Sequence, residues 1–323
     1  MPPPGSLRAL SILLLLATGC GPQGPHRDHV EVLFALDALR VPLPPAAPAV
    51  QALGARLFAA PSPAAGSGFA CASCHDLAKH GQDHRRLAVA GDTETPRRNT
   101  PTVFDSARQV LQGWDGVATD LPGIVRRELE LRLGVRTDAT VRLWLHDPAH
   151  RQPDLAEYFA LAFPGQPQGS LDQVVTALCA HLATLRSVGR WDRYVEGDES
   201  ALSAEERAGV RAFLDAGCAT CHAGRNLGGA SAHKLGLVHA YPSADPGRFL
   251  RTRLAADEFV FKAPMLRRVV HTAPYLHDGS IESLAEVVRR MAWHELGRTL
   301  APDVVGSILK FLQAVGDVDP SGR

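Results

Sequence analysis

The sequence predicts an all-α protein made of two tandem domains, and three observations support this prediction. Apolar residues recur at helical spacing along most of the chain, and no segment shows the alternation expected of a half-buried strand. The motif Cys-x-x-Cys-His occurs twice, at 71–75 and 218–222, and each copy follows a helical segment. The chain has 323 residues, which is long enough for two domains that each bury a core.

The N-terminal region is predicted to lie outside both domains. Arg8 precedes an apolar run over 10–16 that is too short to span a bilayer, as in a secretory signal peptide. Ala17-Thr18-Gly19-Cys20 resembles a bacterial lipobox, so 1–20 is interpreted as a lipoprotein signal peptide with Cys20 acylated. A plain signal peptide is the alternative. Both predict export to the periplasm, and the lipid anchor is the only membrane contact expected.

The predicted elements then follow in order. Residues 21–48 are rich in Pro, Gly and Ala and are interpreted as a tether. In the first domain, 49–190, helical patterns cover 50–58, 121–133, 137–146, 154–162 and 171–187. A turn-rich stretch, 188–200, leads into the second domain, 191–323. There a capping box at 203–206 starts a helix that runs to Leu214, and further helices are predicted at 281–293 and 302–315.

The repeated motif indicates covalent haem. Two thiols at this spacing add to the vinyl groups of one haem, and the adjacent histidine is delivered to the iron as an axial ligand. A Cys₄ zinc site is the alternative, but the two pairs are far apart and zinc gives no reason for a histidine after each. The sequence therefore predicts two haem c groups in two class-I cytochrome c-like domains. Their attachment residues are Cys71, Cys74 and His75, and Cys218, Cys221 and His222.

The residues alone do not identify the second axial ligand of either haem iron. A filled sixth position makes an electron carrier, whereas an empty one admits small oxidants. After the signal peptide the chain has two methionines, Met265 and Met291, and the second lies on an apolar helix face where a core methionine would also fit. For the first haem, ligation by His80 or His84 and an unligated face are both compatible with the sequence.

Net charge excludes one class of partner. Lys and Arg together number 34, and so do Asp and Glu, so no net field attracts a polyanion and no nucleic-acid partner is expected.

Several separated blocks resemble the bacterial dihaem cytochrome c peroxidase family, which includes the MauG proteins. The resemblance covers roughly residues 50–316. The blocks are Leu53-Gly54-Ala55-Arg56-Leu57-Phe58, Arg98-Asn99-Thr100-Pro101-Thr102-Val103-Phe104, Gly113-Trp114-Asp115-Gly116, Trp191-Asp192-Arg193-Tyr194, Gly197-Asp198, Lys262-Ala263-Pro264-Met265-Leu266-Arg267 and Thr272-Ala273-Pro274-Tyr275-Leu276-His277-Asp278-Gly279.

This resemblance assigns roles to residues that the motif alone leaves open. In the family the distal ligand of the second haem lies fourteen residues after the histidine of His-Asp-Gly, which here is Met291. MauG proteins have tyrosine there, so Met291 favours a peroxidase. Trp114 matches the tryptophan between the haems and is expected to be an electron bridge. Three positions that hold a calcium ion in the family are occupied by Asn99, Thr272 and Pro274.

The departures from the family concern the first haem. Where peroxidases that need reductive activation have a displaceable histidine, sixteen residues after the proximal one, this chain has Gly91. The first haem is therefore expected to be open at rest, unless His80 or His84 substitutes.

The distal pair also departs from the family pattern. The glutamine position falls on Ile124, and the glutamate position falls on or near Arg132, with Glu128 and Glu130 close by. A carboxylate can move the proton that peroxide cleavage needs, whereas a guanidinium can only stabilise negative charge. Glu128 and Glu130 also fit ordinary solvated helix positions.

The resemblance implies a periplasmic enzyme that reduces hydrogen peroxide with electrons from a small cytochrome c or a cupredoxin. Electrons would enter at the second haem and pass near Trp114 to the first. Two alternatives keep the fold: a MauG-like oxidase of a protein or small organic substrate, and an electron-transfer module without chemistry. A homodimer is compatible with the resemblance.

Overall fold

The computed structural model describes residues 45–62, 68–89, 96–146, 154–166 and 168–318. The predicted signal peptide with Cys20, nearly all of the predicted tether and Gly91 lie outside these residues. Within the described ranges, no helix is both long enough and apolar enough to cross a membrane.

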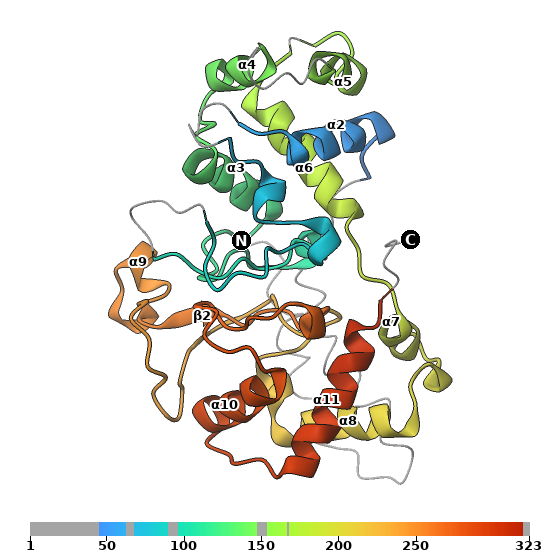
Figure 1. The fold of residues 1–323 in the computed structure, drawn as a ribbon, viewed down its shortest axis with the longest axis vertical. Helices are drawn as coiled ribbons and strands as arrows, with labels where there is room; N and C mark the ends of the chain where they lie inside the picture. Colours follow the sequence, from blue (N-terminus) through green and yellow to red (C-terminus); the bar gives the residue numbers. More distant parts are fainter. Residues whose placement is uncertain (1–44, 63–67, 90–95, 147–153, 167, 319–323) are drawn as a thin grey trace, which may run out of the picture.

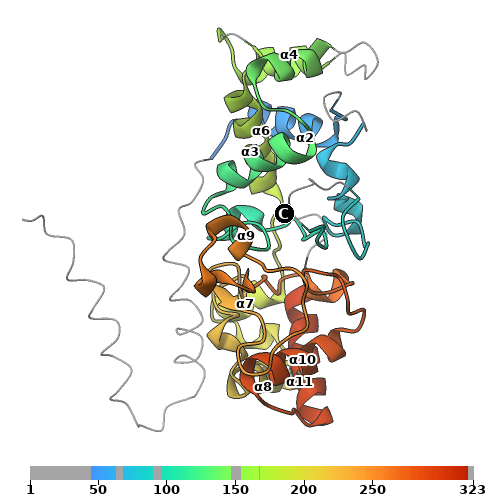
Figure 2. The same ribbon diagram turned by 90° about the vertical axis from the view of Figure 1, so that its left-hand side faces the viewer.

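The protein consists of two helical lobes stacked along its long axis (Figure 1). The first lobe contains α2 (Pro48–Ala59), α3 (Leu121–Arg132), α4 (Asp138–His146), α5 (Leu155–Ala162) and α6 (Leu171–Thr184). The second lobe contains α7 (Arg190–Val195), α8 (Ala204–Ala216), α9 (Phe249–Thr252), α10 (Leu284–Leu296) and α11 (Pro302–Gly316). The same order is visible from the side in Figure 2. The predicted all-α class is confirmed.

Three short elements, two strands and one helix, depart from the sequence prediction. β1 (Ala232–Lys234) and β2 (Val260–Lys262) form an antiparallel pair in which Ala232 is opposite Lys262. Three residues are too few to show an alternating pattern. In the stretch predicted to be turn-rich, α7 forms because the Asp192 side chain accepts a hydrogen bond, 2.9 Å long, from the backbone N–H of Gly189.

Side-chain caps set where several helices begin. The predicted capping box of α8 is confirmed: Ser203 accepts from the backbone N–H of Glu206, whose side chain accepts from that of Ser203. Asp120 caps α3 and Ser283 caps α10 in the same general way, through their side-chain oxygens.

Each lobe is built around a pair of helices that cross at a glycine. α2 packs against α6, and a Cβ added to Gly54 would lie 1.9 Å from the carbonyl oxygen of Ala177. α8 packs against α11, and a Cβ added to Gly209 would lie 2.2 Å from the carbonyl oxygen of Ser307. Only glycine permits either approach. The backbones of both pairs therefore touch directly.

The two lobes have separate hydrophobic cores. Buried residues of the first core lie between Leu53 and Leu182, and those of the second between Trp191 and Val315. The second core is more aromatic: the ring of Phe311 meets those of Trp191 and Phe213 edge to face, each at 5.2 Å between centroids. The division of the chain at 190 and 191 stays a prediction.

Candidate haem-binding sites

Each Cys-x-x-Cys-His motif forms a tight turn that opens onto a cavity. The turns are Cys71–Ser73 and Cys218–Thr220, and in each the histidine N–H donates back to the carbonyl oxygen of the first cysteine, at 2.9 and 3.0 Å. This winding brings two thiols and an imidazole to one wall. Cys71, Cys74 and His75 line the first cavity, and Cys218, Cys221 and His222 line the second.

The two motif histidines are held in the same tautomer. Nδ1 of His75 lies 3.1 Å from the carbonyl oxygen of Gly81, and Nδ1 of His222 lies 3.2 Å from that of Leu227. A carbonyl only accepts, so Nδ1 carries the proton and Nε2 keeps its lone pair for a metal. Burial lowers the pKa of both histidines, which favours the neutral ligand form.

The motif thiols suit covalent attachment. Burial raises the pKa of Cys71 to about 12 and that of Cys218 to about 11, so both are thiols at neutral pH. The four motif cysteines form no disulfide. Two reduced thiols and a neutral imidazole on the wall of a largely apolar cavity fit a covalently bound haem at each site.

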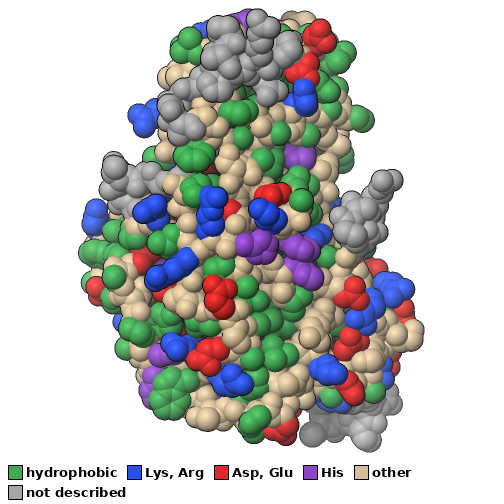
Figure 3. All heavy atoms as spheres, in the orientation of Figure 1, with side chains coloured by type: hydrophobic (Ala, Val, Ile, Leu, Met, Phe, Trp, Pro, Cys, Tyr) green, Lys and Arg blue, Asp and Glu red, His purple; other side chains and the backbone are tan. Residues whose placement is uncertain are grey.

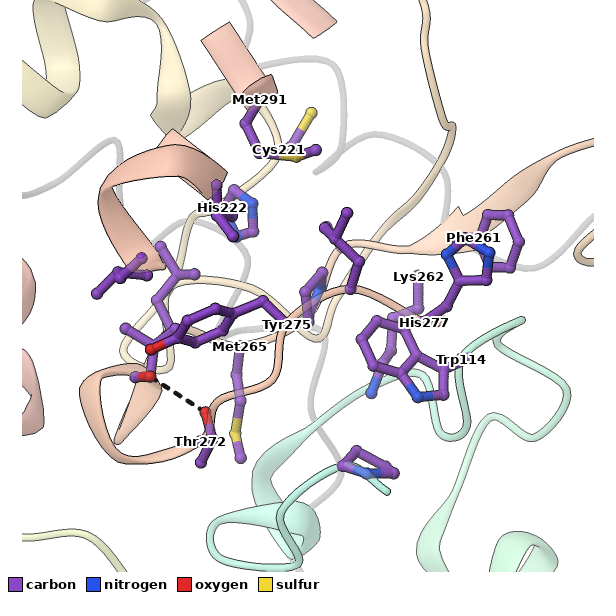
Figure 4. Close-up of a pocket in the computed structure, with 18 of the residues that line it drawn as sticks. Trp114, Cys221, His222, Phe261, Lys262, Met265, Thr272, Tyr275, His277 and Met291 are labelled. Carbon is purple, nitrogen blue, oxygen red and sulfur yellow. Dashed lines mark hydrogen bonds between the residues drawn. The ribbon is translucent and has the colours of Figure 1, made fainter. Parts of the chain in front are cut away.

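In the second cavity, one face of α10 supplies the wall. Leu284, Val287, Val288 and Met291, which recur at helical spacing, line it together. Met265 lines the same cavity from the loop after β2, so both methionines after the signal peptide belong to this site. Met291 and Met265 appear at opposite ends of the view in Figure 4, with His222 between them. Both methionines line the cavity, and the choice of Met291 as the ligand stays a prediction from the resemblance.

In the first cavity, α3 adds charged side chains to an apolar wall, to which Leu121, Val125 and Leu129 contribute. Ile124, Glu128 and Arg132, one turn apart, line the cavity together with Arg127. Arg132 Nε donates to Glu128 Oε2 at 3.3 Å, and the side chain of Glu128 is 45% exposed. Glu130 is not among the lining residues, because two residues turn a helix by roughly 200°.

The alternative ligands of the first haem lie elsewhere. His80 stacks on His271 of the second lobe, with ring centroids 4.2 Å apart. Nδ1 of His84 lies 3.0 Å from the carbonyl oxygen of Ala273. Figure 3 shows histidine side chains gathered on the surface at the level where the lobes meet. Among the described residues that line the first cavity, His75 is the only histidine or methionine.

Trp114 lies on the wall between the two cavities. The residues that line both are Asn99, Thr100, Pro101, Thr102, Gln109, Trp114 and Lys262. The indole Nε1–H of Trp114 donates to the carbonyl oxygen of Asn99 at 2.7 Å, and its own carbonyl accepts from the N–H of Lys262 at 2.8 Å. An electron bridge has to lie between the two haem sites, and Trp114 lines both cavities as that prediction requires. Sequence reasoning gave no role to Gln109 or to Lys262, although Lys262 opens one of the blocks that resemble the family.

The three predicted calcium residues come from both lobes and line one cavity. Asn99, Thr272 and Pro274 all line the second cavity. The N–H of Asn99 donates to the carbonyl oxygen of His277 at 2.7 Å, which ties the two segments together. Among the described residues no cluster of three or more His, Cys, Asp or Glu side chains is suited to a metal, so such a site would consist of amide and carbonyl oxygens.

Comparison with known proteins finds similarity to one family over most of the chain. The profile of the family described as di-haem cytochrome c peroxidase matches residues 48–200. A cytochrome c551 peroxidase of Pseudomonas aeruginosa is 34% identical, over 96% of this chain and 92% of that protein. The methylamine utilization protein MauG of Methylophilus methylotrophus is 32% identical, over 73% of this chain and 70% of that protein.

Solved structures agree on the fold. A MauG-like protein associated with microbial copper homeostasis superposes with a TM-score of 0.73 at 24% identity, covering 87% of this chain and 94% of that one. The diheme peroxidase BthA of Burkholderia thailandensis superposes with a TM-score of 0.65 at 17% identity, covering 86% of this chain and 90% of that one.

Proposed function

This chain belongs to the dihaem cytochrome c peroxidase family, and on that premise we propose that it is a periplasmic enzyme that reduces hydrogen peroxide to water. The observation that carries the proposal is the difference between the cavities. A motif histidine lines each cavity. Met265 and Met291 line only the second cavity, whereas Glu128 and Arg132 line only the first. The second site is thereby suited to carry electrons, and the first to bind a small oxidant.

Membership of the family implies two c-type haems, which supply the one-electron chemistry and, at the first site, the iron that binds peroxide. The chain's own part is to hold and orient them. His75 and His222 each offer Nε2, because Nδ1 is held by a backbone carbonyl. Met291 completes the second site. With no second ligand among the described lining residues, the first site stays accessible.

Glu128 is proposed as the proton-transfer residue of the first cavity. Its carboxylate can take a proton from the near oxygen of peroxide and return it to the far one. Arg132 holds that carboxylate by its Nε–H and adds positive charge where negative charge develops. Glu130, on another face of α3, is assigned no role in this scheme.

Electrons are proposed to enter at the second haem from a small cytochrome c or a cupredoxin and to pass by Trp114. The indole is the aromatic side chain common to both cavity walls, which supports this path. Acylation of Cys20 would keep the enzyme on the periplasmic face of a membrane. One calcium ion held by Asn99, Thr272 and Pro274, and assembly as a homodimer, complete the proposal.

The test is steady-state turnover of the purified protein with both haems loaded. Reduced small cytochrome c is expected to be oxidised in proportion to the hydrogen peroxide added. Low-temperature EPR of the resting protein is expected to show one high-spin and one low-spin ferric haem. Absence of turnover with several competent donors would refute the peroxidase proposal. Two low-spin haems inert to peroxide would instead support a module that only transfers electrons.

A MauG-like oxidation is the second candidate, because Ile124 and Arg132 line the first cavity where the family has a glutamine and near where it has a glutamate. It predicts peroxide consumption without a cytochrome donor, together with a covalently modified partner detectable by mass spectrometry. Met291, in place of the MauG tyrosine, weighs against it.

A further inference from the structure

Lys262 is a buried cation at the boundary of the two cavities. It ends β2, its side chain lines both cavities, and the whole residue is 6% exposed. Its backbone N–H donates to the carbonyl oxygen of Trp114 at 2.8 Å, so the residue is fixed beside the proposed electron bridge. Figure 4 shows its side chain close to Trp114. A lysine is rarely buried this completely without an anion.

Within the described residues the ammonium group lacks such an anion. Its hydrogen-bond acceptor is the side-chain oxygen of Gln109, a neutral group. An ammonium has three donors and needs a negative partner when it is taken out of water. The carboxylate of Asp115 acts on Lys262 only through its charge, because it accepts from Arg98 at 2.8 Å and lies 3.8 Å from Arg251. Burial accordingly lowers the pKa of Lys262 to about 8.

The other cations of the second cavity do not fill this role. Arg267 is fully buried and donates to the carboxylate of Asp192, which neutralises it. Lys234 also lines the cavity but is exposed to solvent. Among the described residues of this wall, Lys262 is therefore the buried cation that forms no ion pair with a carboxylate. The first cavity has further cations, of which Arg98 is paired with Asp245 and Asp115.

A haem carries two propionate carboxylates, which must find positive or hydrogen-bonding partners when the rest of the ring is buried. We propose that Lys262 binds haem propionates at the boundary of the cavities, so that one ammonium group serves carboxylates of both haems. This inference rests on the two-haem content of the proposed function, not on peroxide turnover.

A shared cation has a consequence for redox behaviour. Positive charge held beside a haem favours its ferrous form, which has one positive charge fewer at the iron. Lys262 thus raises the reduction potentials of both haems. Because it acts in a buried site, salt screens this effect only weakly.

The test is a spectroelectrochemical titration of the two-haem protein carrying Lys262→Gln, at fixed pH and ionic strength. Both potentials are expected to fall. At one haem or both, the ratio of reduced to oxidised haem at a fixed applied potential should drop at least tenfold, which is 59 mV for a one-electron couple. Lys262→Arg keeps the charge and is expected to restore most of the shift.

Lys310→Gln is the control, because it removes an exposed lysine of the second lobe that lines neither cavity, and it should leave both potentials unchanged. Equal potentials in wild type and Lys262→Gln would overturn the proposal. If that variant does not load haem, a crystal structure of the wild-type holoprotein decides. A propionate oxygen within about 4 Å of Lys262 Nζ supports the proposal, and its absence refutes it. Absence of turnover in the wild type, together with potentials that fall in Lys262→Gln, would count against the peroxidase function alone.

Discussion

The two lobes attach their haems in the same way but face them with different helices. In both, a helix pair crosses at a glycine, a tight Cys-x-x-Cys turn follows, and a backbone carbonyl holds Nδ1 of the histidine. The difference lies in the helix across the cavity. α10 presents Met291 on an apolar face, whereas α3 presents Glu128 and Arg132. The attachment geometry is thus repeated, and in the proposed function one helix of each lobe supplies the residues that distinguish the two sites.

The largest expected effect concerns the charged face of α3. Glu128→Gln removes the proposed proton-transfer group and should lower peroxidase kcat by about 10²–10⁴-fold. Glu130→Gln is the matched control on the same helix and should leave kcat within about twofold. Steady-state kinetics at saturating peroxide measure both. Equal losses in the two variants, or none in Glu128→Gln, would contradict the assignment.

The next effect concerns the apolar face of α10. Met291→Ala should turn the second haem from low-spin to high-spin and lower its reduction potential, because axial ligands set potentials over a range of about 0.8 V. EPR and redox titration measure the two changes. Met265→Ala, in the same cavity, should leave the spin state unchanged. If Met265→Ala instead gives the high-spin haem, the sulfur from the loop after β2 is the ligand.

A smaller effect would test whether the repeated helix crossings are equally tight. Gly54→Ala and Gly209→Ala place a methyl group against a carbonyl oxygen, and each should destabilise the protein by about 1–3 kcal/mol. Gly306→Ala, in α11 where nothing lies within 4 Å, should instead stabilise it by about 0.5–1 kcal/mol. Tm values of the holoproteins give the comparison. An unchanged Tm for Gly54→Ala would show that α2 and α6 can separate at little cost.

The smallest effect concerns exposed ion pairs that join helices within each lobe. Lys310 of α11 pairs with Glu205 of α8, and both side chains are more than half exposed. Lys310→Met should change the stability by no more than about 0.5 kcal/mol. Arg56 pairs with the less exposed Asp154 in the first lobe. Arg56→Met should therefore lower the free energy of unfolding by more than Lys310→Met does, but by less than about 1 kcal/mol. Denaturant titration of both variants measures the difference.

Local signals in the sequence were sufficient for the repeated parts of the molecule. Helical periodicity and the Ser203 capping box predict α8, and the Cys-x-x-Cys-His motif predicts its own turn. The spacing of Ile124, Glu128 and Arg132 also distinguishes Glu128 from Glu130 once the helix face is considered. The sequence analysis nevertheless left both residues open, and the lining of the first cavity separates them.

Contacts between distant segments were beyond the sequence. Nothing in the sequence near Lys262 indicates that its side chain meets Gln109, or that Arg98 pairs with Asp245 of the other lobe. The β1–β2 pair was missed for the same reason, because its residues are paired by tertiary structure and not by local preference. The sequence also does not indicate that His80 and His84 contact the second lobe, through His271 and Ala273.

The two hydrogen bonds of Trp114 have a mechanical consequence. Its indole is tied to Asn99 in the loop that leads to it, and its backbone is tied to Lys262 on β2 of the second lobe. Electron tunnelling slows exponentially with distance, so a bridge attached to one lobe alone would transmit every relative motion of the lobes to the transfer rate. Because Trp114 is anchored on both sides, the proposed bridge would keep its distance from each haem when the lobes move.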